Sequence, residues 1–543
     1  MKSELTAALK NILEMLGYPD TPVVIQLPKN PVHGDFTSNL AMQLAGKLGS
    51  NPREIAKSIA EKLENDYTQL VTSVEIAGPG FINIHIQKEK IISKIYTVLE
   101  MGPKFGRTEI GKGKKALVEF VSANPTGPLT VGHGRGAILG DVISNILKWN
   151  GYKVKREYYY NNAGRQMQRL GESVKARYLE LLGKKTEFPD EGYEGEYIHD
   201  IAKTLKKQKG SQLENSKDLV TFTQAAEKSI FQDIKNTLEK INIIFDRYFN
   251  EQSLYESGAI ETVLDILKGK DLIYEAEGAT WFRSSTLGQK QDRVMIKSSG
   301  EPTYRLPDMA YHRDKFEREY DIIIDVLGAD HMDAYPDVLA GVEQLGYNLK
   351  KITVLIHQFV TLAKNGEPVK MSTRKAQYVT LDELIDEVGV DVVRYFFLMR
   401  GMNTHLNFDM DLAKDESDEN PVYYLQYAHA RLCNILKHAE SQGHGQSGDA
   451  DLTLLTLKSE IQLIKILIEF PTMIERAHYS LEPQTIAIYL HDIASQFHRY
   501  YAKERVVTDD SDKTAARLIL VKALQTVLCN GLNILGIHAP KRM

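Results

Sequence analysis

Residues Ala116 to Trp149 decide the fold, and they read ALVEFVSANPTGPLTVGHGRGAILGDVISNILKW. Ala116 to Val121 is an apolar run broken only by Glu119, which is typical of a strand buried on both faces of a parallel sheet. Farther along, apolar residues recur on one face of a helix, whose start the pattern places near Gly132 and His133. A strand therefore leads into a helix, and such a helix N-terminus binds phosphate because its N–H groups are unpaired and its dipole favours negative charge.

The link between this strand and this helix distinguishes two nucleotide ligands. Gly132, Gly134 and Ala137 satisfy the GxGxxA pattern of dinucleotide-binding proteins, and an acid, Glu157, follows twenty residues later. In that fingerprint the glycines follow the strand directly, whereas here the segment Ser122 to Val131, with its two prolines, intervenes. We therefore interpret the dinucleotide match as accidental and favour ATP bound for adenylate chemistry.

The segment around His133 carries a family resemblance. PLTVGH resembles the HIGH signature of class I aminoacyl-tRNA synthetases, and ANPTGPLTVGHGRGA resembles arginyl-tRNA synthetases in particular. The resemblance implies that Gly132 admits the adenine and His133 reaches the phosphates, with Pro128 and Gly136 also at the ATP. It further implies a catalytic role for Thr130, which replaces the first histidine of the signature; its hydroxyl donates a hydrogen bond but carries no charge.

The segment YDIIIDVLGADH begins the second half of the predicted sheet. Ile322 to Leu327 predicts a strand, Gly328 ends it, and His331 lies where a helix would start. The resemblance implies that Gly328 and His331 contact ATP. The next predicted strand, Ile352 to Val360, leads through an Asn365-Gly366 turn into a lysine-rich loop.

This loop contains a second signature. KMSTR, at Lys370 to Arg374, resembles the KMSKS motif of class I synthetases, whose loop supplies cations to the phosphates in the transition state. The resemblance implies three ATP contacts: Lys370, Met371 and Ser372. It also makes Lys370 catalytic. Thr373 replaces the second lysine of the motif, so either Arg374 or Lys375 supplies that charge or Lys370 acts alone.

Two acids and a tyrosine are candidates for recognising a guanidinium, which is planar, permanently charged and selective for paired carboxylate contacts. Glu119 interrupts an apolar strand, where a carboxylate is costly unless a cation compensates it. Tyr304 and Asp308 are four residues apart, a spacing that places both on one side of a helix. The resemblance implies that these three residues hold the guanidinium of arginine and that Asn124 lies near its α-amino group. The alternative is that Glu119 pairs with an internal Lys or Arg and that Asp308 caps a helix.

The length of 543 residues predicts roughly three or four domains. Residues 1–108 read as an α/β module and resemble the N-terminal additional domain of arginyl-tRNA synthetases, which implies contact with tRNA. Residues 109–408 predict a Rossmann-type α/β catalytic domain with a parallel sheet and an insertion at about 167–300. Residues 409–543 predict an all-α helix bundle and resemble the anticodon-binding domain of the same family.

Cations and aromatic residues alternate near the end of one predicted helix of the bundle, at Arg499, Tyr500, Lys503 and Arg505. Single-stranded nucleic acid binds such a face, since phosphates pair with cations and bases stack on rings. At helical spacing, several of these residues are equally expected to pack inside the bundle. The resemblance favours contact with tRNA.

Composition limits the class of protein. The net charge of −5 gives no support for nucleic-acid binding by the whole chain, although a local basic face is compatible with it. Only Cys433 and Cys529 are present, so neither a disulfide framework nor a cysteine zinc site is expected. No apolar run reaches the length of a membrane span and the amphipathic N-terminus does not read as a signal peptide, so we expect a cytoplasmic protein.

The resemblance covers almost the whole chain, which is identified as a member of the arginyl-tRNA synthetase family. The implied reaction activates L-arginine with ATP to arginyl-adenylate and then esterifies the 3′ end of tRNA(Arg). We expect Mg²⁺ with the ATP, no structural metal bound by the protein, and a monomer. Two alternatives stay open: a non-catalytic or regulatory tRNA-binding protein on the same fold, and a class I synthetase of different specificity.

Overall fold

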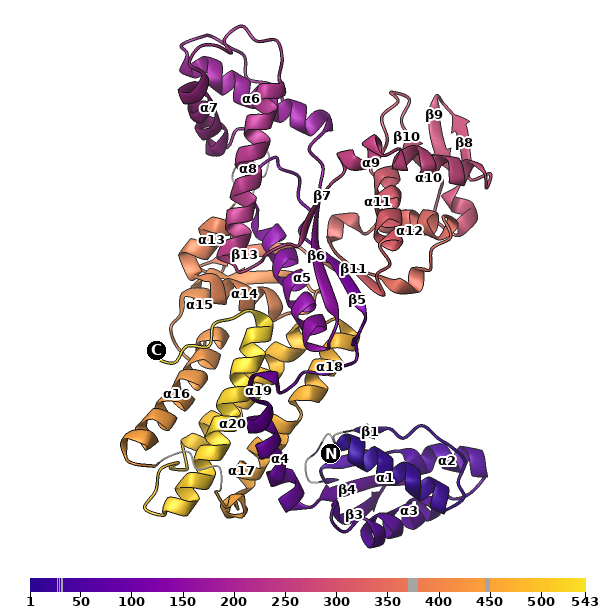
Figure 1. The fold of residues 1–543 in the computed structure, drawn as a ribbon, viewed down its shortest axis with the longest axis vertical. Helices are drawn as coiled ribbons and strands as arrows, with labels where there is room; N and C mark the ends of the chain where they lie inside the picture. The colour runs from indigo at the N-terminus through magenta and orange to yellow at the C-terminus, as the bar shows by residue number, and fades with distance from the viewer. Residues whose placement is uncertain (27, 29, 31–32, 370–378, 445–449) are drawn as a thin grey trace. The chain divides into compact units, whose positions relative to one another are not determined.

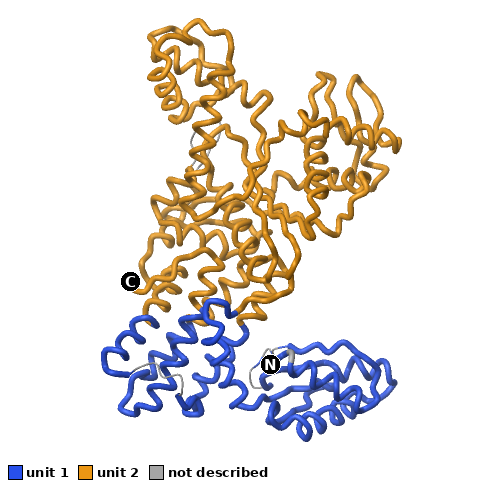
Figure 2. The backbone as a smooth tube through the Cα atoms, in the orientation of Figure 1, with its two compact units in different colours: residues 1–105, 432–469, 495–527 blue, residues 106–431, 470–494, 528–543 orange. Residues whose placement is uncertain are grey.

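The computed structural model describes all residues of the chain except 27, 29, 31–32, 370–378 and 445–449. Its backbone forms two compact units, each built from segments that are distant in the sequence (Figure 2). The first unit comprises residues 1–105, 432–469 and 495–527, and the second comprises residues 106–431, 470–494 and 528–543. The segment Ala116 to Trp149 lies in the second unit.

The core of the second unit is a five-stranded parallel sheet (Figure 1). Its strands are β5 (Lys115–Glu119), β6 (Lys153–Tyr160), β7 (Arg247–Asn250), β11 (Ile322–Gly328) and β12 (Ile352–His357). They lie in the order β12-β11-β5-β6-β7. β5, the first of these five strands along the chain, is therefore central, and the strand order reverses between β5 and β11. The predicted Rossmann-type sheet is therefore confirmed, and such sheets bind ligands beyond the carboxyl ends of the strands where the order reverses.

Helix α5 (Val131–Trp149) follows β5 and packs against β5, β6 and β11. A Cβ atom at Gly140 would lie 2.2 Å from the ring of Phe120, so only glycine lets the helix approach the sheet this closely. The helix begins at Val131, one residue before the predicted start, because Thr130 is its N-cap.

Long connections follow β6 and β7. They contain the helices α6 (Gly164–Leu181), α7 (Glu196–Lys209), α8 (Val220–Lys240), α9 (Gln252–Glu256), α10 (Ala259–Lys268) and α11 (Arg305–Glu317). They also contain an antiparallel sheet of order β10-β9-β8, built from β8 (Ile273–Ala276), β9 (Ala279–Phe282) and β10 (Arg293–Ile296). The range predicted as an insertion, about 167–300, thus includes β7, which belongs to the central sheet. This strand has only four residues, too few to show a recognisable pattern in the sequence.

The prediction of one strand over Ile352 to Val360 is wrong, because β12 ends at His357 and the chain then enters a second small sheet. That sheet has the order β14-β13-β15, with β13 (Val360–Lys364), β14 (Glu367–Pro368) and β15 (Leu406–Asp409). The predicted turn at Asn365-Gly366 joins β13 to β14, with φ values of 53° and 75°. The other helices of this region are α12 (Tyr335–Gln344), α13 (Leu381–Val388), α14 (Val390–Leu398) and α15 (Met410–Lys414).

The first unit contains the predicted N-terminal α/β module. Its antiparallel sheet has the order β1-β2-β4-β3, with β1 (Ile25–Gln26), β2 (Phe36–Ser38), β3 (Val71–Ala77) and β4 (Phe81–Ile86). Its helices are α1 (Lys2–Met15), α2 (Leu40–Leu48), α3 (Pro52–Asp66) and α4 (Lys88–Met101).

The C-terminal part of the chain is helical, as predicted. Its helices are α16 (Pro421–Ser441), α17 (Lys458–Ile468), α18 (Phe470–Ser480), α19 (Gln484–Tyr501) and α20 (Ser511–Leu535). By length and hydropathy, α20 is an exception to the expectation that no segment resembles a membrane span. However, 72% of its most apolar window is buried inside the structure, as in the core helix of a globular protein.

Candidate active site

Thr130, in the first position of the signature, caps the start of α5. Its backbone N–H donates a hydrogen bond to Nδ1 of His133 (3.1 Å), and its hydroxyl lies 3.2 Å from the same nitrogen. Because Nδ1 accepts a backbone hydrogen bond, the proton of a neutral His133 is on Nε2. Burial lowers the pKa of His133, although Asp330 opposes this effect, so the ring is neutral at pH 7. The signature therefore presents a neutral imidazole whose Nε2–H can donate to a phosphate oxygen.

The glycines of the signature differ in what surrounds them. A Cβ atom at Gly132 would meet only the Thr130 hydroxyl, at 3.7 Å, so this position is open to a ligand. A Cβ atom at Gly134 would lie 2.6 Å from the Leu381 side chain, and one at Gly136 would lie 2.8 Å from Nε2 of His357. Gly132 thus fits the predicted approach of a nucleotide, whereas Gly136 also serves the packing of α5. Its assignment to ATP stays a prediction.

Two histidines lie at the carboxyl ends of the neighbouring strands. His331 ends the short 3-10 helix Ala329–His331, which follows Gly328, and its side chain is 48% exposed. His357 ends β12, and burial, with a smaller contribution from the charge of Arg135, lowers its pKa to about 4. Sequence analysis missed His357, because the strand was predicted to continue to Val360 and His357 therefore lay inside it.

The second signature, Lys370 to Arg374 with the ATP contacts predicted at Lys370, Met371 and Ser372, lies outside the described residues. The chain on its C-terminal side is well anchored beside the first signature. The Leu381 N–H donates to the carbonyl of Leu129 (2.8 Å), and Thr380 forms a β-bridge with Thr130. Thr380 and Leu381, which follow residues 370–378 in the sequence, are therefore adjacent to the cap of α5 in space.

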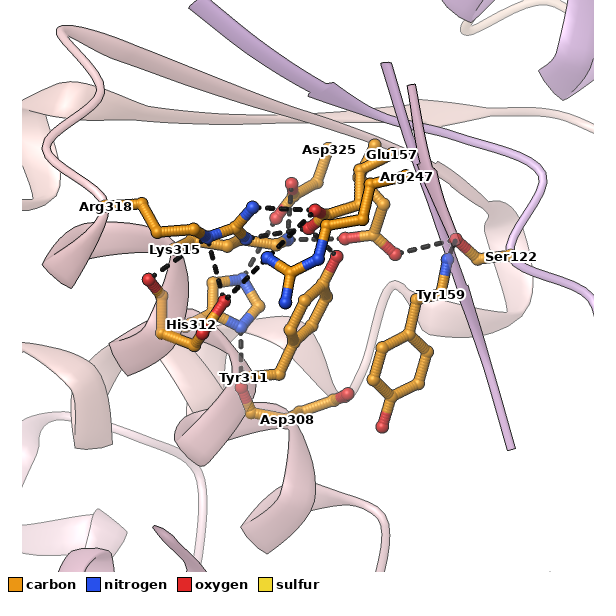
Figure 3. Close-up of polar contacts among 12 residues, drawn as sticks. Ser122, Glu157, Tyr159, Arg247, Asp308, Tyr311, His312, Lys315, Arg318 and Asp325 are labelled. Atoms are coloured by element: carbon orange, nitrogen blue, oxygen red, sulfur yellow. Dashed lines mark hydrogen bonds and ion pairs between the residues drawn. The ribbon is translucent and has the colours of Figure 1, made fainter. Parts of the chain in front are cut away.

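Glu119, predicted to hold arginine, has an internal partner. Its Oε2 contacts Nζ of Lys315, which also donates to Oδ1 of Asp325 (2.8 Å), and its Oε1 accepts from the hydroxyl of Ser122 (2.7 Å), as Figure 3 shows for the labelled partners. Lys315 is fully buried. The alternative that Glu119 pairs with an internal cation is thus the arrangement in the structure.

A strained turn keeps Ser122 in this position. β5 ends at Glu119, two residues before the predicted end, and both Val121 and Ser122 have positive φ, of 69° and 46°. The Ser122 N–H donates to the carbonyl of Phe120 (3.0 Å), which is the geometry of a γ-turn about Val121. A β-branched residue rarely adopts this conformation, so the surrounding contacts must stabilise it.

Asp308 contrasts with Glu119. It lies in the first turn of α11, and within the described part of the chain its carboxylate has no hydrogen-bonding or ionic partner. Burial raises its pKa to about 6, and the charge of Glu119 adds to this while His312, His331 and Lys315 oppose it. The carboxylate does not cap the helix, whose N-cap is Tyr304. Tyr304 itself is 55% exposed.

A third acid, Glu251, lies, like Asp308, near Tyr159 and was missed by sequence analysis. It is buried and accepts hydrogen bonds from the hydroxyl of Tyr159 (2.5 Å) and from Nδ2 of Asn161 (2.7 Å). The Asn161 N–H in turn donates to Oδ1 of Asn124 (3.0 Å), the residue predicted to lie near the α-amino group. Both Asp308 and Glu251 raise the pKa of Tyr159, after burial itself. The signal was an acid directly after β7, but that strand was not detected.

The dinucleotide alternative fails at Glu157. This acid is buried and is held by two hydrogen bonds from Arg318 (2.6 and 2.7 Å) and one from the hydroxyl of Tyr311 (2.7 Å). It is therefore unavailable to a ribose hydroxyl.

Among the described residues, no group of three or more His, Cys, Asp or Glu side chains is placed to hold a metal ion.

The predicted tRNA-binding face in the first unit needs one correction. Arg499, Lys503 and Arg505 are exposed, but Tyr500 is only 2% exposed and its hydroxyl donates to Glu460 (3.4 Å). Tyr500 is thus a core residue, because helical spacing turned it toward the interior. The three cations stay predicted tRNA contacts.

Comparison with known proteins agrees with this geometry. Three family models match the chain: "Arginyl tRNA synthetase N terminal domain" over residues 1–86, "tRNA synthetases class I (R), catalytic domain" over residues 94–395, and "DALR anticodon binding domain" over residues 425–543. The chain is 53% identical to an arginine–tRNA ligase of Desulfotalea psychrophila, covering 96% of this chain and 94% of that protein. It is 48% identical to an arginine–tRNA ligase of Salinibacter ruber, with both chains covered completely.

Solved structures show the same similarity. A putative arginyl-tRNA synthetase from Campylobacter jejuni superimposes with a TM-score of 0.78 at 33% identity, covering 84% of this chain and all of that one. The arginyl-tRNA synthetase of Thermus thermophilus shares the fold over the full length of both chains, with a TM-score of 0.78 at 21% identity. Since the catalytic family model and full-length relatives both match, the chain belongs to the arginyl-tRNA synthetase family.

Proposed function

We infer that this chain is an arginine–tRNA ligase, which activates L-arginine with ATP and transfers the arginyl group to tRNA(Arg). The observation that carries its substrate specificity is Asp308, a largely enclosed carboxylate without a partner in the described part of the chain. Asp308 is close enough to Glu119, at the end of β5, to feel its charge. Residues 120–130 connect the end of β5 to the phosphate-binding start of α5, so a cation and a triphosphate are both accommodated at one edge of the sheet.

In the first step the carboxylate of arginine attacks the α-phosphate of ATP and releases pyrophosphate. We assign His133 to donate its Nε2–H to a phosphate oxygen that gains charge in the transition state, assisted by the dipole of α5. Lys370 adds a cation from the loop whose C-terminal end is anchored beside Thr130. Thr130 acts by fixing the ring of His133. The remaining ATP contacts of this proposal are Pro128, Gly132, Gly136, Gly328, His331, Met371 and Ser372.

Recognition of arginine rests on carboxylates that lack a cation of their own. Asp308 accepts from the guanidinium, and Glu251 adds a second negative charge behind Tyr159. Asn124 lies at the α-amino end, and Tyr304 contacts the side chain from its exposed position. Glu119 contributes because it shares the single cation of Lys315 with Asp325, so this cluster keeps the excess negative charge that a permanently charged guanidinium requires.

The second step requires tRNA. We propose that residues 1–108 and 409–543 bind tRNA(Arg), the former as an additional domain and the latter at the anticodon, with 109–408 catalysing both steps. Exposed Arg499, Lys503 and Arg505 are the proposed contacts in the C-terminal helices. We further propose that Mg²⁺ enters on the triphosphate, bound mainly by phosphates and water, and that the enzyme is a cytoplasmic monomer.

Exchange of labelled pyrophosphate into ATP tests this function. Exchange that requires both arginine and tRNA(Arg), followed by charging of that tRNA in a panel of amino acids, is the expected result. Absence of exchange with every amino acid would establish the non-catalytic alternative, and exchange with another amino acid would establish a different specificity. Light scattering during size exclusion measures whether the enzyme is a monomer.

A further inference from the structure

Arg135, in the second turn of α5, is an unusual buried cation. Four lysine or arginine side chains are buried among the residues that the structure describes: Arg135, Lys315, Arg394 and Arg517. The last three each contact a carboxylate, in turn Glu119 with Asp325, Asp141, and Glu460 with Glu504. Arg135 has no carboxylate partner within the described residues, and burial lowers its pKa to about 10. It is still protonated at pH 7, so a full positive charge is enclosed without a counterion.

Only backbone carbonyls hold the Arg135 guanidinium. One terminal nitrogen donates to the carbonyls of Gln358 (2.7 Å) and Thr404 (3.0 Å), and the other donates to that of Gly401 (3.0 Å). Its Nε, although buried, has no hydrogen-bond partner in the described part of the chain. These carbonyl dipoles reduce the cost of burying the charge, but an ion without a counterion remains expensive to bury.

The position of this charge suggests what compensates it. Arg135 lies two residues after His133, so its charge adds to the positive end of the α5 dipole. Its effect reaches the ligand side of the sheet, since the charge of Arg135 lowers the pKa of His357, whose Nε2 lies against Gly136. The side chains that surround this edge include His133, His357, Asp330 and His331, of which only Asp330 is negatively charged at pH 7, and its side chain is 70% exposed.

The carbonyls that Arg135 binds belong to the segments that begin and flank β13. Gln358 connects β12 to β13, and Gly401 and Thr404 precede β15, the parallel neighbour of β13. β13 and β14 lead to residue 369, directly before the KMSTR loop. One side chain therefore joins the helix that carries the first signature to the segments that precede β13 and β15.

We propose that Arg135 is a positioning residue for ATP: its buried charge attracts the triphosphate to the start of α5, and its three carbonyl bonds hold the segments that precede β13 and β15 beside this helix. The proposal rests on the proposed ATP site at His133. The substrate then supplies the counterion that the protein lacks, and the charge acts without touching the nucleotide.

Calorimetry on the full chain tests the role of this charge by measuring the affinity for a series of nucleotides. Arg135→Gln keeps amide donors for the carbonyls but removes the charge. We expect it to weaken ATP binding about tenfold, which is the scale for two charges about 10 Å apart at the effective dielectric of a protein. The loss should decrease from ATP to ADP to AMP and vanish for adenosine. A purely structural role predicts equal losses for all four ligands, and either equal losses or no loss overturns the proposal.

Arg135→Lys and a control separate charge from folding. Arg135→Lys keeps the charge and loses the fork, so ATP affinity should stay within about threefold of wild type while the rate of adenylate formation falls. If Arg135→Lys loses as much ATP affinity as is expected for Arg135→Gln, the charge role is overturned. This result is decisive even if Arg135→Gln does not fold. Arg394→Met removes a buried arginine that has a carboxylate partner; it should lower the melting temperature without a graded effect along the nucleotide series.

His133→Ala distinguishes failure of this proposal from failure of the site itself. If His133→Ala leaves adenylate formation unchanged, the ATP site is misplaced and the role of Arg135 falls with it. If His133→Ala is slow but Arg135→Gln shows no graded loss, only the inference about Arg135 is wrong.

Discussion

Asp308→Asn is the most informative single substitution, because it keeps the size and polarity of the side chain and removes only the charge. The carboxylate has no partner in the described part of the chain, so few protein contacts are lost with it. A hydrogen bond to a charged group contributes about 1.5 to 3 kcal/mol, which corresponds to a fall of roughly 10- to 150-fold in kcat/KM for arginine. Affinity for ATP should hardly change.

The pH dependence provides an independent prediction for the same residue. Burial raises the pKa of Asp308 from 3.8 to about 6, so the free enzyme loses this charge as the pH falls below about 6. We expect kcat/KM for arginine to fall about tenfold per pH unit below that value, and this limb should disappear in Asp308→Asn.

The raised pKa of Asp308 also predicts an effect on folding stability: stability falls as the pH rises, whereas kcat/KM for arginine increases. Because the folded-state pKa is above the unfolded value, the folded protein binds more protons between pH 3.8 and about 6, and its stability falls as the pH rises through that window. Above it, the ionised Asp308 costs at most about 3 kcal/mol. Asp308→Asn should therefore be at least as stable as wild type at pH 8 while being a poorer enzyme.

Steady-state pyrophosphate exchange from about pH 4.5 to about 8.5, with urea unfolding at both ends, measures all three effects. Glu317→Gln is the matched control, since it removes an exposed acid of the same helix whose surface pair with Arg313 contributes little. A KM for arginine within twofold of wild type in Asp308→Asn, with an unchanged pH profile, would refute the role of Asp308 in binding the guanidinium.

Further substitutions test His133, Lys315 and the predicted tRNA-binding face. His133→Ala should slow adenylate formation about 100-fold in pyrophosphate exchange, and an unchanged kcat would remove His133 from the mechanism. Lys315→Met should lower the free energy of unfolding by about 3 to 5 kcal/mol in urea, because it leaves buried carboxylates unpaired; Lys315→Arg should recover part of this loss, and a neutral result would contradict the buried pairing. Arg499→Ala and Arg505→Ala should weaken tRNA binding and reduce its salt dependence without changing the melting temperature, whereas Tyr500→Ala should mainly destabilise the protein; full tRNA affinity in the arginine variants would place the contact elsewhere.

The parts of the fold that the sequence predicted are those that local patterns determine. The strand and helix around the first signature follow from an apolar run, a helical period and a cap, and all of these lie within one short segment. β7 was missed because four residues show no period, and the split of the strand at His357 depends on pairing with β15, far along the chain. The orientation of Tyr500 depends on which helix face packs inward, which spacing alone leaves undetermined.

The candidate site was predictable to the extent that a signature marks it. His133, Thr130 and Gly132 lie in one motif, and the structure gives each a definite local environment. Lys315 could not be predicted as the partner of Glu119, because 196 residues separate them and the pairing exists only in the folded protein. Glu251 was missed for the same reason, since its position near Tyr159 depends on an edge strand that the sequence does not reveal.

Helix α11 shows why the two predicted arginine-binding acids differ. Asp325, Glu119 and Glu157 occupy one row across three neighbouring strands, and all three are buried. α11 compensates this row with Lys315 and Arg318, which pair with its three carboxylates and fix the helix against the sheet.

Asp308 lies about two turns before Lys315 on the same helix, and among the described residues no cation of α11 contacts its carboxylate. The contacts that fix α11 therefore also fix the distance of Asp308 from the end of β5, and the substrate supplies the missing cation. Lysine can provide the charge, but only a guanidinium also provides the planar, paired donors that an enclosed carboxylate requires. We therefore propose that selectivity for arginine follows from a fixed helix with one acid left for the substrate, and a substitution that loosens α11 should bring the KM values for arginine and for lysine closer together.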